Sequence, residues 1–351
     1  MKVYGRFIKF LALIAVFSCL GITSYGQDAQ FSQFYASSLY LNPALAGAEP
    51  DITFSSNFRQ QWRSIVQPYT TSQVSLIVPY HVSKIKDSHK GGAGFSFYND
   101  RAGDGNLKTL GVNLTAAYNV ALSRNGLNYL SFGMQAGIIQ KSLDYNNLEW
   151  GSQYNAGLGF DPNQPVNETN LLTNRIYPDV NAGLMYYYNA AKNYHFTDWS
   201  AYIGASGYHL NQPNESFLST KTSRLPMLLK THAGFEYNIS KKVNLSPNAI
   251  FMYQNLKYQV NAGLYLTYAL KQSNFGVVSS TNLILGGWYR LDDAYIASIG
   301  LSSSFYTIGF SYDVNSSSLR NYTSGRGAYE VSLTLRRITK NRIKRFSTPR
   351  I

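Results

Sequence analysis

Apolar and polar residues alternate strictly along most of this chain, and this alternation constrains the fold more than any other feature. Apolar residues occupy every second position, and the positions between them are polar or small, as in a β-strand with two unlike faces. Clear stripes begin at Val112, Leu130, Val180, Val260, Tyr306 and Tyr329. The pattern predicts an all-β protein of antiparallel strands.

Composition indicates which way the apolar faces point. The chain has 29 Tyr, 19 Phe and 28 Gly, and only 14% of its residues are charged. Beyond residue 26 it lacks the run of roughly 18 apolar residues that a membrane helix needs. In a soluble sandwich the apolar faces would meet in a core, whereas in a transmembrane barrel they contact lipid. The many aromatic residues near strand ends favour the barrel, with Leu114, Phe132 and Leu264 facing outward.

Counting every candidate segment predicts about fourteen strands, an even number that lets each backbone group find a partner within lipid. The predicted strand centres lie near residues 55, 76, 95, 115, 134, 184, 203, 234, 248, 264, 283, 298, 308 and 331. An even strand number places both ends of the barrel on the periplasmic side. The longest connections, 141–177, 209–229 and 314–325, then lie on the extracellular side.

The first 26 residues are typical of a secretory signal peptide, with basic residues followed by a short apolar run and small residues before Gln27. The only cysteine, Cys19, lies in this leader, so the mature chain has no thiol for disulfides, metal binding or catalysis. The remaining chain divides into an N-terminal segment over 27–47, an outer-membrane barrel over 48–337 and a basic periplasmic tail over 338–351.

Catalytic and metal-binding patterns do not stand out. The five histidines show neither a zinc-binding i, i+4 spacing nor an H-E-x-x-H motif, and we interpret them as turn or rim residues. Asp292 and Asp293 follow Arg290 in what is best explained as a charged hairpin loop. We therefore expect no enzyme activity, no catalytic residues, no cofactor and no metal, and an outer-membrane hydrolase is the weakest hypothesis. An exported chain of this pattern is also not expected to bind nucleic acid.

The formal net charge is +13, and many of the basic residues fall in the predicted periplasmic turns and in the C-terminal region. They could simply solvate these turns, or they could form a docking surface for an acidic periplasmic protein. The unpaired tail favours docking. The candidate docking residues are Arg336, Arg337, Lys340, Arg342, Lys344 and Arg345.

Several ordered blocks resemble the PorP/SprF family of outer-membrane proteins, which is linked to type IX secretion and gliding motility. The opening QDAQFSQFYASSLYLNPALAG is similar to the start of that family, and Asn57–Trp62 resembles its next block. Further similar blocks are 244–254, Gly287 to Arg290, Ile308 to Asp313 and Gly327 to Leu333. The resemblance covers nearly the whole mature chain. Two departures are Tyr329, where the family often has His, and the long basic extension after Leu335.

The resemblance implies a non-enzymatic outer-membrane barrel that assists type IX secretion and attaches a partner, often a large gliding-related adhesin, at the cell surface. The implied partners are the C-terminal domain of a secreted adhesin, periplasmic components of the secretion system and outer-membrane lipid. Aromatic residues of the longest loop could anchor the partner, or could pack within a folded loop. These residues are Tyr145, Trp150, Tyr154 and Phe160.

The opening segment has an apolar face at roughly helical spacing, and Asn42-Pro43 should end such a helix. We expect the segment to pack in or under the barrel as a plug, although a disordered leader is the alternative. The predicted plug residues are Phe31, Phe34, Tyr35, Tyr40, Asn42 and Pro43. Asn-Pro-Ala is also similar to the N-terminal region of fatty-acid-transporter-like barrels, so a porin or a channel for small hydrophobic molecules is the alternative function. The polar inner faces argue mildly against it.

Overall fold

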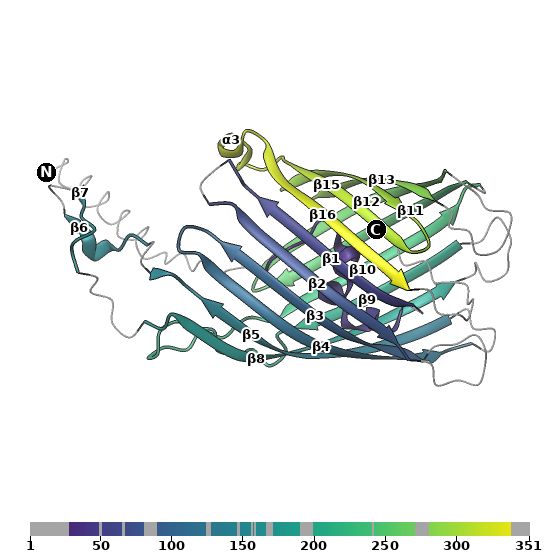
Figure 1. Ribbon diagram of the computed structural model, residues 1–351, viewed down its shortest axis with the longest axis horizontal. Helices are drawn as coiled ribbons and strands as arrows, with labels where there is room; N and C mark the ends of the chain where they lie inside the picture. The colour runs from purple at the N-terminus through teal and green to yellow at the C-terminus, as the bar shows by residue number, and fades with distance from the viewer. Residues whose placement is uncertain are drawn as a thin grey trace, which may run out of the picture.

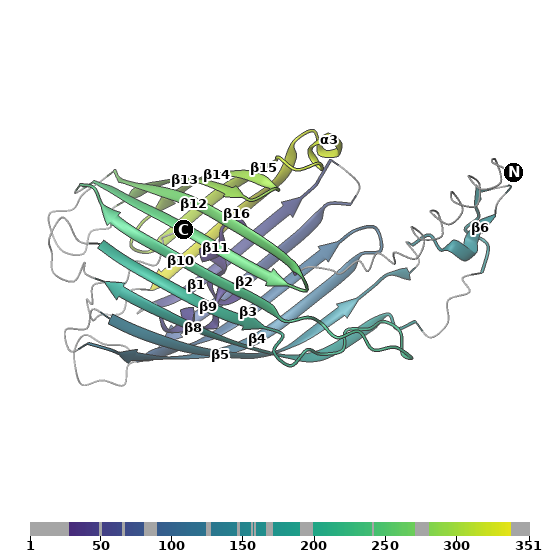
Figure 2. The same cartoon turned by 180° about the vertical axis from the view of Figure 1, so that it is seen from behind.

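The computed structural model describes residues 28–48, 51–64, 67–80, 90–123, 128–145, 148–155, 157, 159–165, 171–189, 199–240, 242–270 and 281–337. Fourteen strands form a closed antiparallel barrel (Figures 1 and 2). They are β1 (Ile52–Gln61), β2 (Tyr69–Pro79), β3 (Gly91–Ala102), β4 (Leu107–Ala121), β5 (Asn128–Ser142), β8 (Asn174–Asn189), β9 (Trp199–Tyr208), β10 (Leu228–Asn238), β11 (Val243–Gln254), β12 (Lys257–Ala269), β13 (Asn282–Arg290), β14 (Ala294–Ser302), β15 (Tyr306–Asn315) and β16 (Arg326–Arg337).

Each strand pairs with its neighbour in the chain, and β1 closes the barrel by pairing with β16 from Ile52↔Arg337 to Gln61↔Ala328. Closure leaves no unpaired edge, which a sheet in lipid requires. The predicted fold class is therefore confirmed, and every predicted strand centre falls inside an observed strand. Among the described residues, no helix has the length and apolar character needed to cross a membrane.

The two faces of the wall are as the alternation predicts. Leu114 is 66% exposed and Phe132 49% exposed on the outer surface. Their neighbours Asn113, Thr115 and Ser131 are buried inside the barrel. Because successive side chains of a strand point to opposite faces, one apolar stripe per strand gives a continuous apolar outer band, while the inward positions carry these polar residues together with apolar ones such as Ile250 and Trp288.

The barrel has two unlike rims, which we call the near rim, at the start of β1, and the far rim, at the end of β1. The near rim carries both ends of the barrel, since β1 begins where β16 ends. The far rim carries the connections β1–β2, β3–β4, β5–β8, β9–β10, β11–β12, β13–β14 and β15–β16. At the far rim, the short sheet of β6 (Tyr154–Asn155) and β7 (Gly159–Phe160) follows the 3-10 helix η4 (Gly151–Gln153), and α3 (Arg320–Thr323) lies between β15 and β16 (Figure 1).

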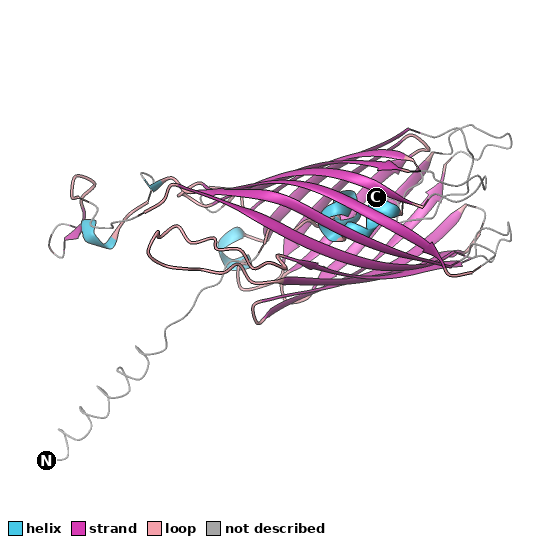
Figure 3. Ribbon diagram, turned by 90° about the horizontal axis from the view of Figure 1, so that it is seen from below, coloured by secondary structure: helices cyan, strands magenta, loops and turns pink. Residues whose placement is uncertain are grey.

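Three short helical turns lie inside the barrel (Figure 3). They are η1 (Phe34–Ser37), α2 (Ser38–Leu41) and η2 (Pro43–Gly47). Their apolar side chains form the centre of the largest buried cluster, in which Phe34, Leu41 and Leu45 pack against wall residues such as Met185 and Trp288. The interior of this barrel is thus a packed core rather than an open pore.

Candidate functional site

The lumen segment, residues 28–48, is the most deeply buried part of the described chain. Leu39, Asn42, Ala44 and Ala46 are each 0% exposed, and Phe31 is 2% exposed. The segment begins beside wall residues of the far half, since Asp28 contacts Gln254 at the end of β11. It ends in the near half, where Gly47 accepts a hydrogen bond from Asn119 of β4. The segment therefore runs lengthwise through the lumen, from the far side to the rim where β1 begins.

Glycines of the wall allow the segment to lie directly on the strands. A Cβ atom added at Gly133 of β5 would overlap the backbone nitrogen of Ala44, and one added at Gly92 of β3 would overlap the carbonyl of Ala46. Glycine inside a strand often marks a site where another backbone approaches closely. The inner-wall glycines whose added Cβ would meet this segment are Gly92, Gly94, Gly133, Gly183 and Gly204.

Asn42 fixes the centre of the lumen segment. Its side-chain oxygen accepts from the backbone nitrogen of Ala44 at 2.9 Å and caps η2, for which Pro43 supplies the first residue. Its amide nitrogen lies 3.1 Å from the carbonyl oxygen of Leu184, 3.3 Å from that of Ala205 and 3.1 Å from Nε2 of His232. One side chain therefore joins the segment to β8, β9 and β10. Asn42 does end a helix as predicted, but it also starts the next one.

A buried network of charged groups holds the start of the segment. Arg59 of β1 forms ion pairs with Asp313 at 2.8 Å and with Glu330 at 3.2 Å, and all three side chains are at most 1% exposed. Arg290 lies 3.2 Å from the same Asp313 oxygen. The hydroxyl of Ser32 donates to Asp313 and accepts from both arginines. Buried charges are tolerated when they are paired and hydrogen-bonded in this way.

Glu330 binds the segment backbone as well. Its two carboxylate oxygens accept from the backbone nitrogens of Ser32 at 2.6 Å and of Gln33 at 2.9 Å. The Gln33 amide donates to the Glu330 carbonyl at 3.0 Å and accepts from the hydroxyl of Ser332. We call Ser32, Arg59, Arg290, Asp313 and Glu330 the lumen ion network. It links β1, β13, β15 and β16 to the lumen segment.

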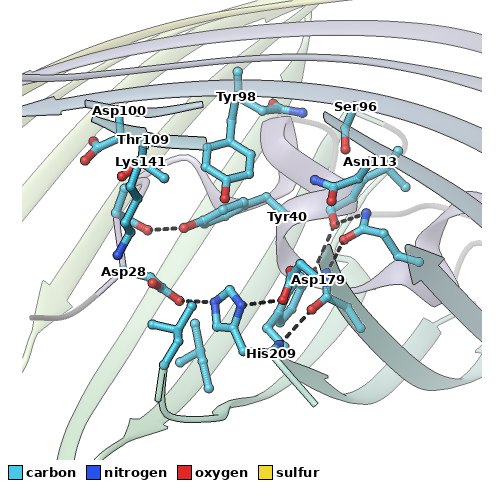
Figure 4. Close-up of a pocket in the computed structure, with 18 of the residues that line it drawn as sticks. Asp28, Tyr40, Ser96, Tyr98, Asp100, Thr109, Asn113, Lys141, Asp179 and His209 are labelled. Carbon is cyan, nitrogen blue, oxygen red and sulfur yellow. Dashed lines mark hydrogen bonds and ion pairs between the residues drawn. The ribbon is translucent and has the colours of Figure 1, made fainter. Parts of the chain in front are cut away.

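A second anchor is formed by His209, the first residue after β9. Its Nδ1 lies 2.7 Å from Asp179 and its Nε2 2.8 Å from Asp28 (Figure 4). Burial lowers the pKa of His209, but the charge of Asp28 and hydrogen bonds to both carboxylates outweigh this and raise it to about 10. Burial raises the pKa of Asp28, yet the charge and hydrogen bond of His209 bring it down to about 2. An imidazolium therefore bridges the segment to the wall.

Lys230 of β10 is the third anchor. Its ammonium donates to the carbonyl oxygen of Tyr40 at 2.6 Å. It also lies 4.0 Å from the ring centroid of Tyr40 and 4.2 Å from that of Tyr208. Two aromatic faces and a carbonyl thus surround a cation that is 3% exposed.

The structure places the predicted plug residues together inside the barrel. Phe34 packs against Trp288 with ring centroids 6.0 Å apart, and Phe31 meets Tyr40 edge-on at 5.5 Å. The hydroxyl of Tyr202 donates to that of Tyr35 at 2.6 Å. Phe34 and Tyr35 thus contact aromatic residues of the wall, and Phe31 contacts another ring of the segment.

The predicted partner-binding aromatics do not form one patch. The rings of Tyr145 and Trp150 pack on each other at 5.8 Å, and the Tyr145 hydroxyl donates to the carbonyl oxygen of Leu172 within the loop. Tyr154 and Phe160 face each other across β6 and β7 at 5.9 Å, and Tyr154 is 61% exposed. Of these four residues, Tyr154 is the one that presents most of its surface to a partner.

The predicted docking residues divide between the barrel and the tail. Arg336 and Arg337 are the last two residues of β16, within the predicted barrel bounds, and Arg336 donates to Thr307 of β15 at 2.9 Å. Lys340, Arg342, Lys344 and Arg345 lie outside the described residues, as do the signal peptide and the tail 338–351.

The interpretation of the histidines as turn or rim residues is wrong for His232, which lies within β10 and is 2% exposed. His209 does lie in the β9–β10 turn, but it is 6% exposed, and both residues contact the lumen segment. His81, His89 and His195 lie outside the described residues. Asp292 and Asp293 do lie in the β13–β14 turn, as predicted.

Sequence reasoning missed the lumen ion network, His209 and Lys230. A signal was present, because Arg59, Lys230, Asp313 and Glu330 occupy the inward positions of stripes whose outward positions are apolar. Charged residues at inward positions of a barrel require partners inside it. The inner-wall glycines were a second signal, since they break strands that are otherwise well patterned.

Comparison with solved structures finds 102 similar chains. A Pseudomonas aeruginosa FadL homologue is similar to this chain at 10% identity, with 86% of this chain and 94% of the other covered and a TM-score of 0.43. A TodX monoaromatic hydrocarbon channel mutant gives 10% identity, 87% and 94% coverage and a TM-score of 0.48. The CymD monoaromatic hydrocarbon channel gives 12% identity, 90% and 96% coverage and a TM-score of 0.40. No curated protein matches the sequence.

The sequence itself gives the more specific result. Residues 23–335 match the family model described as type IX secretion system membrane protein PorP/SprF. The match includes the lumen segment and all fourteen barrel strands up to Leu335. It confirms the resemblance that the sequence blocks indicated. The chain belongs to the PorP/SprF family of type IX secretion system membrane proteins.

Proposed function

We propose that this protein holds a secreted partner at the cell surface, outside the barrel, and does not conduct it through the lumen. The partner is a large adhesin of the gliding type, bound through its C-terminal domain. The observation that carries the proposal is the lumen segment, which the lumen ion network, Asn42, His209 and Lys230 attach to seven strands or strand ends around the wall. A polypeptide could not pass without breaking these contacts.

The proposed orientation rests on strand number and loop length. An even number of strands places both barrel ends at the near rim, and the longest connections at the far rim support an extracellular far rim and a near rim that meets periplasmic secretion components. A signal peptide over 1–26 would export the chain, and the tail over 338–351 would extend the near rim as a basic docking segment.

The two longest far-rim loops support a binding surface there. The backbone nitrogen of Leu172 donates to the Phe217 carbonyl at 2.8 Å, and Lys141 forms an ion pair with Glu215. The end of the first connection at Leu172 and the second connection around Glu215 and Phe217 therefore contact each other, which lowers the entropy that a partner would have to remove on binding there. Tyr154 lies on β6, beyond the ends of β5 and β8 (Figure 1), and is the proposed central contact.

The alternative, a channel for small hydrophobic molecules, lacks support from the lining. Side chains such as Asn57, Gln135 and Asn181 are buried on the inner wall, and each is hydrogen-bonded. A path for greasy substrates would need apolar walls. The inner wall also carries apolar residues such as Met185 and Trp288, but these belong to the buried cluster of the lumen segment and do not surround an open path.

Two experiments test the proposal. Deletion of 28–46 should raise the single-channel conductance of the purified protein in planar bilayers well above that of the intact chain. Unchanged conductance would remove the plug. For partner retention, Tyr154→Ser should shift the adhesin from the cell surface into the medium. Tyr322→Ser, at another far-rim residue that is 76% exposed, is the matched control. Equal release from both variants would refute the role of Tyr154.

A further inference from the structure

A cavity of about 160 Å³ lies between the lumen segment and the far rim (Figure 4). Its floor includes Asp28, Leu39 and Tyr40 of the segment. Its walls come from β2, β3, β4, β5, β8, β9, β10 and the β9–β10 loop, and it reaches the β3–β4 turn through Ala102 and Leu107. We call it the far-rim cavity. Its volume would hold several water molecules or one ligand the size of a monosaccharide.

Two amide side chains that line this cavity lack hydrogen-bond partners among the described residues. Gln73 of β2 is 1% exposed, and neither its nitrogen nor its oxygen has a partner. Asn113 of β4 is 5% exposed, and its oxygen also has none. Buried amides are nearly always hydrogen-bonded in native proteins, so such groups indicate a missing partner.

The charged groups of the cavity are mostly paired with each other. Lys141 is paired with Glu215, and His209 bridges Asp28 and Asp179. The Lys230 ammonium is held by the Tyr40 carbonyl and two rings. The groups of the cavity that can still form hydrogen bonds with a ligand are thus neutral side chains and one carboxylate.

That carboxylate is Asp100 of β3. One of its oxygens accepts from the Thr71 hydroxyl at 2.6 Å, and no described hydrogen bond uses the other. The neighbouring Tyr98 ring meets the Tyr40 ring edge-on at 5.7 Å, so the cavity also has an aromatic surface.

From these observations we infer that the far-rim cavity binds a neutral, hydroxyl-rich ligand of monosaccharide size, either a free sugar or the end unit of a surface glycan. Its hydroxyls donate to the Asp100 carboxylate and to the oxygens of Gln73 and Asn113. One ligand oxygen accepts from the Gln73 amide. The carbon face of the ligand packs on tyrosine rings. This inference does not depend on the proposed partner, because retention of the adhesin can be measured separately.

The test uses the full-length protein, purified in detergent. Binding of glucose, galactose, mannose and N-acetylglucosamine is measured by calorimetric titration up to millimolar concentrations, with sodium acetate and ethylammonium as charged probes. We expect saturable binding of at least one sugar and none of the charged probes. Absence of saturable binding by all four sugars, or tighter binding of a charged probe, would overturn the inference.

Substitutions locate the site. Gln73→Leu removes both hydrogen-bonding atoms and should weaken sugar binding by about tenfold or more. The matched control is Asn261→Leu on β12, because Asn261 is 0% exposed, has an unpartnered amide nitrogen and lies outside the cavity lining. Equal effects of the two substitutions would refute the site.

A second variant keeps the test decisive if Gln73→Leu does not fold. Tyr98→Phe removes one hydroxyl, and Asp100→Asn removes the charge and replaces one acceptor oxygen with a donor nitrogen, so the wall keeps its shape in both. At least one of them should weaken sugar binding in a barrel that still shows the electrophoretic shift of a folded protein. Methyl glycosides separate the two sources, since equal binding of sugar and glycoside indicates a glycan end and loss on methylation indicates a free sugar.

Discussion

Arg59 on β1 and Asp313 on β15 form an ion pair at 2.8 Å across the intervening strand β16, with both side chains 1% exposed. The pair links two strands that are not hydrogen-bonded to each other, and Ser32 of the lumen segment donates to the same carboxylate. The seam of the barrel and the contents of its lumen are therefore stabilised by the same charges.

Removal of the Arg59 guanidinium should destabilise both the seam between β1 and β16 and the docking of the lumen segment. Arg59→Met leaves Asp313 and Glu330 buried with Arg290 as the remaining cation, and we expect a loss of about 3–5 kcal/mol in the free energy of unfolding. Urea titration followed by tryptophan fluorescence measures it. The control is Lys141→Met, which breaks a pair that is about one-fifth exposed and should cost less. Similar losses in the two variants would contradict the assigned importance of the lumen ion network.

The inner-wall glycines give a steric prediction. Gly133→Ala places a methyl group against the backbone of Ala44, so the segment must shift, at a cost of about 1–3 kcal/mol. Gly287→Ala on β13 is the control, because no atom lies within 4 Å of the added carbon. Thermal unfolding compares the two. A Gly133→Ala protein as stable as the control would show that the segment does not press on the wall.

The His209 bridge predicts a pH dependence of segment docking, and neither His209 nor Asp28 belongs to a membrane-spanning strand. The pKa of His209 is raised from 6.5 to about 10, so its stabilisation is complete below 6.5 and is lost as pH rises through about 10. The pKa of Asp28 is lowered from 3.8 to about 2, so its stabilisation is present above 3.8 and is lost as pH falls through about 2.

Docking should therefore be strongest between about pH 4 and pH 6.5 and should weaken towards pH 10. Resistance of the segment to a protease active over the alkaline range measures the upper limit. His209→Gln provides the comparison, because the difference between the two proteins isolates the bridge from other titrating groups. A difference that stays constant from pH 6 to pH 10.5 would disprove the assignment.

The β11–β12 turn should gain stability from one substitution. Asn255 and Leu256 both have positive φ angles, 47° and 64°, and they connect Gln254 to Lys257 as a two-residue hairpin. Asn suits this conformation, whereas Leu256 is strained and 80% exposed. Leu256→Gly should raise the free energy of unfolding by about 1 kcal/mol. Leu256→Ala, which keeps the Cβ atom, should give little of this gain, and equal gains would point to lost apolar exposure instead.

The sequence by itself determined the wall of this protein. Leu114 and Phe132 share one face and Asn113 and Ser131 the other because side chains alternate along any strand, and the aromatic-rich composition indicates that the apolar face is the outer one. The number of strands, and their closure into a barrel, follow from the same pattern and from the need to pair every backbone group in lipid.

Only the tertiary structure decided which side chains contact each other inside the barrel. Arg59, Asp313 and Glu330 lie far apart in the chain, and their contact depends on the register in which β1 closes onto β16, which no local period encodes. The same holds for Asn42, whose partners come from β8, β9 and β10. Alternation fixes only the direction in which a side chain points, whereas closure fixes which inward-pointing side chains come within hydrogen-bonding distance.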